Sequence, residues 1–183
     1  MTVAISLLRG INVGGHHLIP MAALRALYEE LGVRQPQTYL QSGNVVFRAS
    51  ARDLARLGGR LEAAIENRFG FRPDVMIRTA AELRDVIARN PFATRRGIEP
   101  AKLAVLFLAR DPGAAARGKL RGIDTGPEEL RIHDRELYIY FPNGMGRPKL
   151  SAQLIEKTLE TPGTARNWNT VTRLAEMAEK LEG

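Results

Sequence analysis

The sequence contains no cysteine, no long apolar run and little lysine. The lack of cysteine excludes disulfides, thiol nucleophiles and thiolate metal sites, and it is typical of proteins in a reducing compartment. The apolar stretch near the N-terminus, Val3 to Leu8, is too short for a signal-peptide core, and no segment approaches the ~20 apolar residues of a membrane span. We therefore expect a cytoplasmic protein with no membrane partner.

The net charge of +7 comes mainly from arginine, because only 5 of the 27 basic residues are lysine. A positive excess favours anionic partners such as nucleic acid or phosphorylated ligands. The excess is dispersed, however: no run of five like charges occurs, and the densest spot is Arg95-Arg96. A diffuse basic surface that follows from an arginine- and alanine-rich composition is the alternative interpretation.

The first half of the chain has the pattern strand, helix, hairpin, helix, strand. Val3 to Leu8 predicts a buried strand, and the apolar spacing after Pro20 predicts a helix that ends at Gly32. "TYLQSGNVVFR" predicts a hairpin, residues 54–69 a second helix, and the segment from Asp74 another strand. This order is the split βαβ pattern of ferredoxin-like folds.

The second half nearly repeats that order. A helix around residues 83–87 and an irregular, arginine-bearing linker over residues 91–100 precede a buried strand from Leu103. A weakly helical stretch, a hairpin around Asp134-Arg135 and two further helices follow. We predict an α+β fold with two pseudo-repeated ferredoxin-like (split βαβ) halves, residues 1–79 and 80–183. The second half is expected to have an extra C-terminal helix, with a helix where the first has its fourth strand.

The segment "LLRGINVGGHH" places a glycine-rich loop directly after the first predicted strand. Gly10 and Gly15 are spaced as in a P-loop, but His16-His17 stands where Lys-Ser or Lys-Thr would be needed, which argues against that mechanism of nucleotide hydrolysis. Two interpretations remain. The loop amides could form an anion nest beside a helix N-terminus, or the glycines could serve only the positive φ of a turn.

Two further segments contain polar residues beyond what local structure requires. In "QSGNVVF" a tight turn explains Gly43 and Asn44 but leaves Gln41 unexplained. In "TARNWNTV" one asparagine is expected to cap a helix while Trp168 packs inward, and the second asparagine and the arginine have no such role. "FPNGMGRPKLS" leads into a helix and makes Lys149 a further candidate for anion binding.

Catalytic and metal-binding patterns are absent from the sequence. The three histidines are His16, His17 and His133, and no local motif supplies the carboxylates that would complete a metal site, so no metal is predicted. No Ser-His-Asp context, G-x-S-x-G elbow or paired-carboxylate motif occurs. Arginine, lysine, asparagine and glutamine orient anions but are poor general bases, which favours binding or electrostatic catalysis.

The blocks "LLRGINVGG", "TYLQSGNVVF" and "TARNWNTV" resemble the signature blocks of the domain of unknown function 1697 family, over Val3 to about Leu181. The resemblance implies a duplicated α+β architecture with ferredoxin-like halves and implies no function. This chain departs from the family at His16-His17, where relatives often have a more basic loop, and at Pro148, where serine is expected. The family's blocks correspond here to Arg9, Gly10, Asn12, Gly14 and Gly15, to Gln41, Ser42, Gly43 and Asn44, and to Arg166, Asn167, Trp168, Asn169 and Thr170.

The sequence therefore predicts a binding module for a phosphorylated ligand or nucleic acid. Tyr138 and Tyr140 share one face of a predicted strand and offer RNA a stacking surface, although such a pair is more often sheet packing. A small-molecule enzyme with a cleft between the halves and a structural or interaction protein are the alternatives; cofactor, oligomeric state and ligand identity are left open. The candidate ligand-binding residues are Arg9, Gly10, Asn12, Gly14, Gly15, Gln41, Ser42, Asn44, Lys149, Arg166, Asn167 and Asn169.

Overall fold

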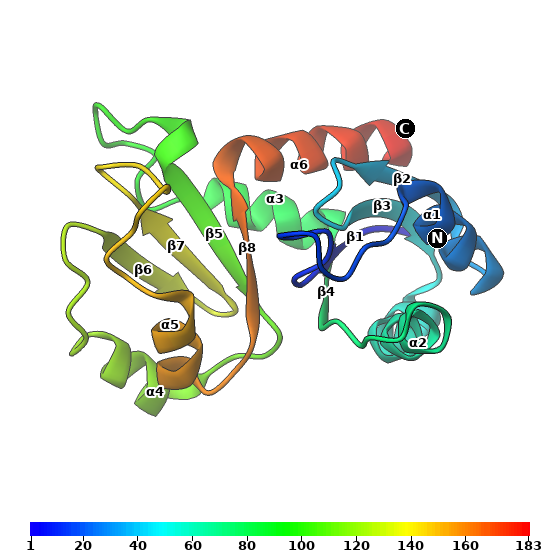
Figure 1. Cartoon of the computed structure of the whole chain (residues 1–183). Coiled ribbons are helices and arrows are strands. Elements are labelled where there is room, and N and C mark those ends of the chain that lie inside the picture. The colour runs from blue at the N-terminus through cyan, green and yellow to red at the C-terminus, as the bar shows by residue number, and fades with distance from the viewer. The chain divides into compact units, whose positions relative to one another are not determined.

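The computed structural model describes residues 1–183 and shows a mixed α+β fold with two four-stranded antiparallel sheets (Figure 1). The chain divides into two units, Met1–Asp85 with Arg173–Gly183, and Val86–Thr172. Each unit contains one of the sheets, and the boundaries fall inside the third and the last helix. None of the helices combines the length and the apolar character needed to cross a membrane.

The first unit is built around the strand order β2-β3-β1-β4. Leu24 and Tyr28 of one helix and Leu57 and Ile65 of the next pack on a single face of this sheet together with Phe47. The elements from the N-terminus are β1 (Thr2–Leu8), α1 (Met21–Glu30), β2 (Arg34–Tyr39), β3 (Asn44–Ala49), α2 (Ala51–Phe69), β4 (Val75–Thr79) and α3 (Ala80–Ala88).

These elements follow from local sequence chemistry. β1 is buried from Val3 to Leu8, which explains why its residues are apolar except for Ser6. α2 begins where the Ser50 hydroxyl accepts a hydrogen bond from the Asp53 amide, and it ends at Gly70, whose φ of 80° closes the helix. The helix continues through Gly58-Gly59 because its apolar face is buried against the sheet.

The second unit has the strand order β6-β7-β5-β8. Ala116 and Leu120 of α4 and Ile155 and Leu159 of α5 cover one face of this sheet and pack on Leu106 among others. The elements are a 3-10 turn η1 (Pro100–Lys102), β5 (Leu103–Leu108), α4 (Gly113–Leu120), β6 (Glu129–His133), β7 (Glu136–Tyr140), α5 (Ala152–Leu159), β8 (Gly163–Asn167) and α6 (Trp168–Glu182).

The prediction that the second half lacks a fourth strand was wrong. Gly163–Asn167 forms β8 and pairs antiparallel with β5, and α6 begins immediately after it. The segment "GTARN" has few of the β-branched and aromatic residues by which strands are recognised in a sequence. It forms a strand nevertheless, because pairing with the apolar β5 stabilises it.

The tyrosines of β7 do not offer RNA an exposed stacking surface. Tyr138 and Tyr140 are buried, and the Tyr138 hydroxyl donates a 2.6 Å hydrogen bond to the Val86 carbonyl. Phe92 packs against Tyr140 with 5.9 Å between ring centroids. Both tyrosines therefore belong to the packing of the second unit.

Candidate functional site

The loop between β1 and α1 folds as a small hairpin. The His16 amide donates to the Val13 carbonyl at 3.0 Å, and the Asn12 amide donates to the His17 carbonyl at 3.1 Å. Gly14 and Gly15, with φ of 58° and 77°, form its two-residue turn. Positive φ at both central positions is what a type I′ turn requires, so hairpin geometry accounts for these two glycines.

Asn12 connects this hairpin to the turn between β2 and β3. Its Oδ1 accepts the Ile19 amide at 2.8 Å, and its Nδ2 donates to the Ile19 carbonyl at 3.1 Å and to the Gln41 carbonyl at 2.7 Å. His17 adds a second support because its ring stacks on Phe71 at 4.3 Å between centroids. The Asn12 amide is thus engaged in holding the two loops together, while the side chain of Gln41 is exposed.

The β2–β3 turn is supported from inside by Asn44. This side chain is fully buried, and its Nδ2 donates to the Tyr39 carbonyl at 2.8 Å and to the Ser42 hydroxyl at 2.9 Å. Leu40, at the start of the turn, is exposed at a φ of 57°. Of the predicted residues in this turn, Asn44 shapes the backbone, and Gln41 and Ser42 are exposed.

The three cations proposed for the anion site all have contacts within the protein. Arg9 pairs with Asp74, with 3.2 Å between Nη1 and Oδ2, and the Lys149 ammonium lies 3.0 Å from an Asp124 carboxylate oxygen. The pKa of Asp124 is lowered, mainly by the hydrogen bond from the Gly126 amide and next by the contact with Lys149. These pairings reduce the charge that either cation presents to a ligand.

Arg166 lies in β8 and is buried. Its Nη1 donates to the Thr164 hydroxyl at 2.8 Å and to the Ala165 carbonyl at 2.9 Å. Burial lowers its pKa to about 10, since the charged guanidinium is removed from water. Its buried position is consistent with a role in holding the strand.

The two asparagines of "TARNWNTV" have different roles. Asn167 accepts the Thr170 amide at 2.8 Å through Oδ1 and thereby caps α6, as predicted for one of the two. Asn169 is exposed, and Trp168 between them is half-buried. Arg9 to Asn44 thus gather at the loops of the first unit, whereas Lys149 and the β8–α6 residues belong to the second.

A basic hollow on α2 was not predicted from the sequence. Arg52, Arg56 and Arg60 line a cavity of about 530 Å³ together with Ser50 and Asp53. The sequence does contain the pattern, because the three arginines are spaced by four residues, which places them on one face of a helix.

The arginines of this hollow are not paired with carboxylates. None of the three forms an ion pair, and the one contact of Arg60 is a 3.1 Å hydrogen bond to the Leu31 carbonyl. Further along the same segment the pattern changes, because Arg68 pairs with Glu30 and Arg72 pairs with Glu62 and Glu66. The hollow therefore concentrates positive charge on the first half of α2.

One carboxylate does lie within the hollow. Asp53 accepts a 2.6 Å hydrogen bond from the Ser50 hydroxyl at the start of α2. Its negative charge offsets part of the arginine charge, and the N-terminus of α2 adds a partial positive charge. No group of three or more histidine and acidic side chains anywhere in the chain is placed to hold a metal ion.

A family model described as "Protein of unknown function (DUF1697)" matches residues 1–138. Among solved structures, the chain is similar to the conserved bacterial protein SP0830 from Streptococcus pneumoniae, with a TM-score of 0.70 and 23% sequence identity over 98% of this chain and 99% of that one. At that identity the similarity shows the fold alone. No curated protein matches the chain.

Proposed function

The chain belongs to the DUF1697 family, whose function is unknown, and we propose that it is a binding module for a phosphorylated ligand held by the arginines of α2. The observation that carries this proposal is the row Arg52, Arg56 and Arg60, which is exposed, lines one hollow and has no ion-pair partner. Arginine presents a planar fork of donors that matches phosphate oxygens, and it keeps its charge at every physiological pH.

The spacing of the row favours a ligand with more than one phosphate. Four residues of helix rise by roughly 6 Å, so the backbone positions of the three arginines follow one another along the helix in steps of that size. A diphosphate or a nucleic-acid strand can contact two of them at once, whereas a single phosphate engages one. The predicted partners, a phosphorylated ligand or nucleic acid, share this chemistry.

We further propose that the two units are ferredoxin-like repeats. The elements from β1 to α3 and from β5 to α6 follow the same order, and the two strand orders correspond. Backbone contacts recur as well: the Leu8 amide donates to the Gly43 carbonyl at 2.9 Å, and the Leu108 amide donates to the Arg135 carbonyl at 2.8 Å. This correspondence supports a duplicated βαββαβ unit.

The last strand of each unit supports the same proposal. A buried arginine occupies the same register, since Arg78 of β4 pairs with Ile5 and Arg166 of β8 pairs with Val105. In both cases Nη1 donates to the carbonyl of the preceding residue. This repetition supports a structural role for Arg166.

The proposed function is tested by two double variants of equal charge. R52Q/R56Q removes two arginines without ion pairs, and R68Q/R72Q removes two paired arginines from the same segment. Binding of labelled single-stranded RNA and DNA, and of inorganic pyrophosphate, is measured over a range of salt concentrations. With a single strand, R52Q/R56Q is expected to lower the slope of log affinity against log salt by roughly 1.4, because each lost phosphate contact contributes about 0.7.

The control variant should retain most of the affinity, since its arginines are already neutralised by glutamates. Equal losses in both variants would show that only the net charge of +7 matters. If R52Q/R56Q binds with wild-type affinity, the arginines of α2 are not the binding site, and Arg9 with the opening loop is the remaining candidate. Binding of pyrophosphate without RNA or DNA identifies a small phosphorylated ligand, and the reverse identifies nucleic acid.

A further inference from the structure

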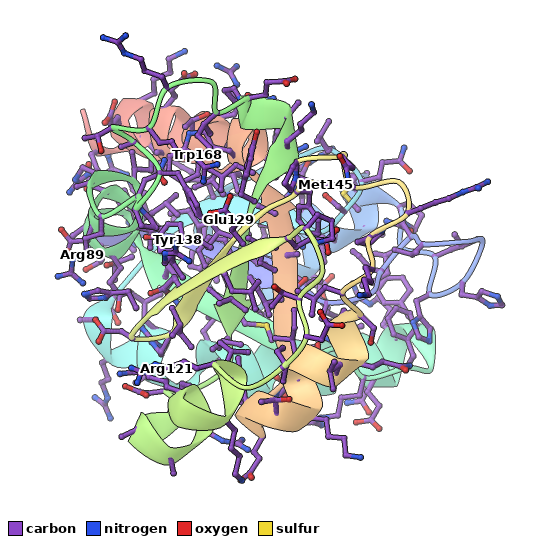
Figure 2. The ribbon with its side chains drawn as sticks, turned by 90° about the vertical axis from the view of Figure 1, so that its left-hand side faces the viewer. Arg89, Arg121, Glu129, Tyr138, Met145 and Trp168 are labelled. Carbon is purple, nitrogen blue, oxygen red and sulfur yellow. The ribbon has the colours of Figure 1, made fainter.

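The second unit contains a separate cavity of about 360 Å³ beside the half-buried Trp168. It is lined by the end of α3, by the linker between residues 90 and 100, by the start of β5 and by Trp168 at the start of α6. Trp168 is labelled in Figure 2. Leu103, Ile87 and Ile98 supply apolar surface. Its volume lies within the range of small-ligand sites, which is about 300–1,000 Å³.

The linker that was expected to be irregular is held in consecutive turns. The Asn90 side chain accepts the Phe92 amide at 3.0 Å, the Ala93 amide donates to the Asn90 carbonyl at 3.2 Å, and the Arg95 amide donates to the Phe92 carbonyl at 3.1 Å. Phe92 anchors the linker, because it is buried and packs on Tyr140. The wall of the cavity is therefore shaped before any ligand arrives.

Arg95 is held in place by two contacts. Its Nη1 donates to both carboxylate oxygens of Glu129, at 2.6 and 2.7 Å, and its guanidinium lies 5.7 Å from the centre of the Tyr140 ring. The carboxylate of Glu129 balances the charge of Arg95. The Nε and Nη2 groups of Arg95 make no hydrogen bond within the protein, so they remain as donors.

The other polar side chains of the cavity also offer donors. The Trp168 indole N–H has no hydrogen-bond partner, and the Asn90 amide nitrogen has none because only its oxygen is engaged. Every lining side-chain group without a partner is thus a donor. A ligand that uses these groups presents acceptors, together with flat apolar surface toward Trp168.

We infer that this cavity binds a planar heteroaromatic ring with acceptor atoms, of the size and chemistry of a nucleobase. The ring packs against Trp168 and the apolar wall, and its ring nitrogens or carbonyls accept from the indole, Asn90 and Arg95. Stacking on an aromatic side chain is open to any nucleobase, because every base has a flat π face. This site belongs to the second unit and the arginine row of α2 to the first, and neither proposal depends on the other.

Adenosine is the probe for this site, because it carries a base but no phosphate and so does not test the arginine row. Trp168 is the only tryptophan of the chain, and its fluorescence therefore reports on this cavity alone. We expect titration with adenosine to change the emission of Trp168 in a saturable manner. Free N-acetyltryptophanamide is the control, because adenosine changes its fluorescence emission by collisions only.

Two neighbouring variants locate the binding. Ala93 is exposed and lines the cavity, so Ala93→Phe fills it without changing the core, whereas Thr94→Phe places the same ring on an exposed residue that does not line it. Ala93→Phe is expected to weaken adenosine binding at least tenfold, and Thr94→Phe to bind as the wild type does. An unsaturable change like that of the free indole, or equal affinity in Ala93→Phe and the wild type, would overturn the inference.

Discussion

Gly43 lies where the β2–β3 turn approaches the end of β1 most closely. A Cβ at this position would be 2.7 Å from the Leu8 Cβ and 2.9 Å from Cδ1 of Ile11, and the backbone φ is 82°. Asn12 and Asn44 fix the same two loops through side-chain hydrogen bonds to the backbone. Asn12 of the first signature block, and Gly43 and Asn44 of the second, therefore fix the conformation of these two loops.

Gly43→Ala is expected to lower the free energy of unfolding by roughly 2–4 kcal/mol. The added methyl group would clash with Leu8 and Ile11, and alanine is strained at this positive φ. Gly59→Ala is the control, since Gly59 lies in α2 with no atom within 4 Å of the added carbon. In a helix this change stabilises by about 0.5–1 kcal/mol. Urea unfolding of both variants checks the prediction, which fails if Gly43→Ala unfolds at the wild-type midpoint.

At the scale of elements, each unit continues from its fourth strand into a helix that the last strand residue caps. The Thr79 hydroxyl accepts the Glu82 amide at 3.1 Å, and Glu82 in return accepts the Thr79 amide at 2.7 Å. The Asn167 side chain caps α6 with a single bond, accepted from the Thr170 amide. The third signature block is therefore, in part, a junction between a strand and a helix.

Asn167→Ala is expected to cost about 1 kcal/mol of stability, because the first turn of α6 loses the acceptor for one of its amides. Asn169→Ala should change stability by less than about 0.5 kcal/mol, since this side chain is exposed in the first turn. Thermal unfolding compares the two variants directly. Equal losses would mean that Asn169 carries an interaction beyond capping, which would make it a stronger candidate for ligand contact.

At the scale of the whole molecule, each unit contains a buried tyrosine whose hydroxyl has a hydrogen-bond partner. The hydroxyls of Tyr28 and Ser6 lie 2.6 Å apart in the first unit, and that of Tyr138 donates to the Val86 carbonyl in the second. Burial raises the pKa of both phenols above the usual value. The neutral phenol is thus the form that the folded state favours.

Stability is therefore expected to fall at high pH. Because the folded-state pKa is raised, the contribution of Tyr28 is complete below the unfolded pKa of about 10 and is lost as the pH rises through the folded value. In this interval the free energy of unfolding should drop by up to about 1.4 kcal/mol per pH unit for Tyr28. Urea unfolding at several alkaline pH values measures the slope.

Tyr28→Phe is the matching variant. It is expected to be less stable at neutral pH, because the buried Ser6 hydroxyl loses its partner, and to show a shallower decline above pH 10. Identical slopes in the variant and the wild type would show that Tyr28 ionises with its ordinary pKa. The comparison separates the hydrogen bond from the titration.

Most of the secondary structure could be predicted from the sequence because it depends on local chemistry. Apolar spacing indicated α2 and α6, and the "QSGN" turn indicated the β2–β3 hairpin. β8 was missed because its residues form a strand only when β5 is beside them. The arginine row of α2 was visible as a spacing but not as a site, since ion pairing distinguishes it from Arg68 and Arg72.

The sequence by itself determined the α+β class, the order of most elements and the family, because apolar periodicity, turn residues and ordered motifs are local in the chain. Only the tertiary structure decided which polar residues hold the fold and which face solvent. Asn44 and Arg166 lie inside, while the arginines of α2 and the donors around Trp168 remain available. Burial and pairing decide this, and both depend on residues far apart in the sequence.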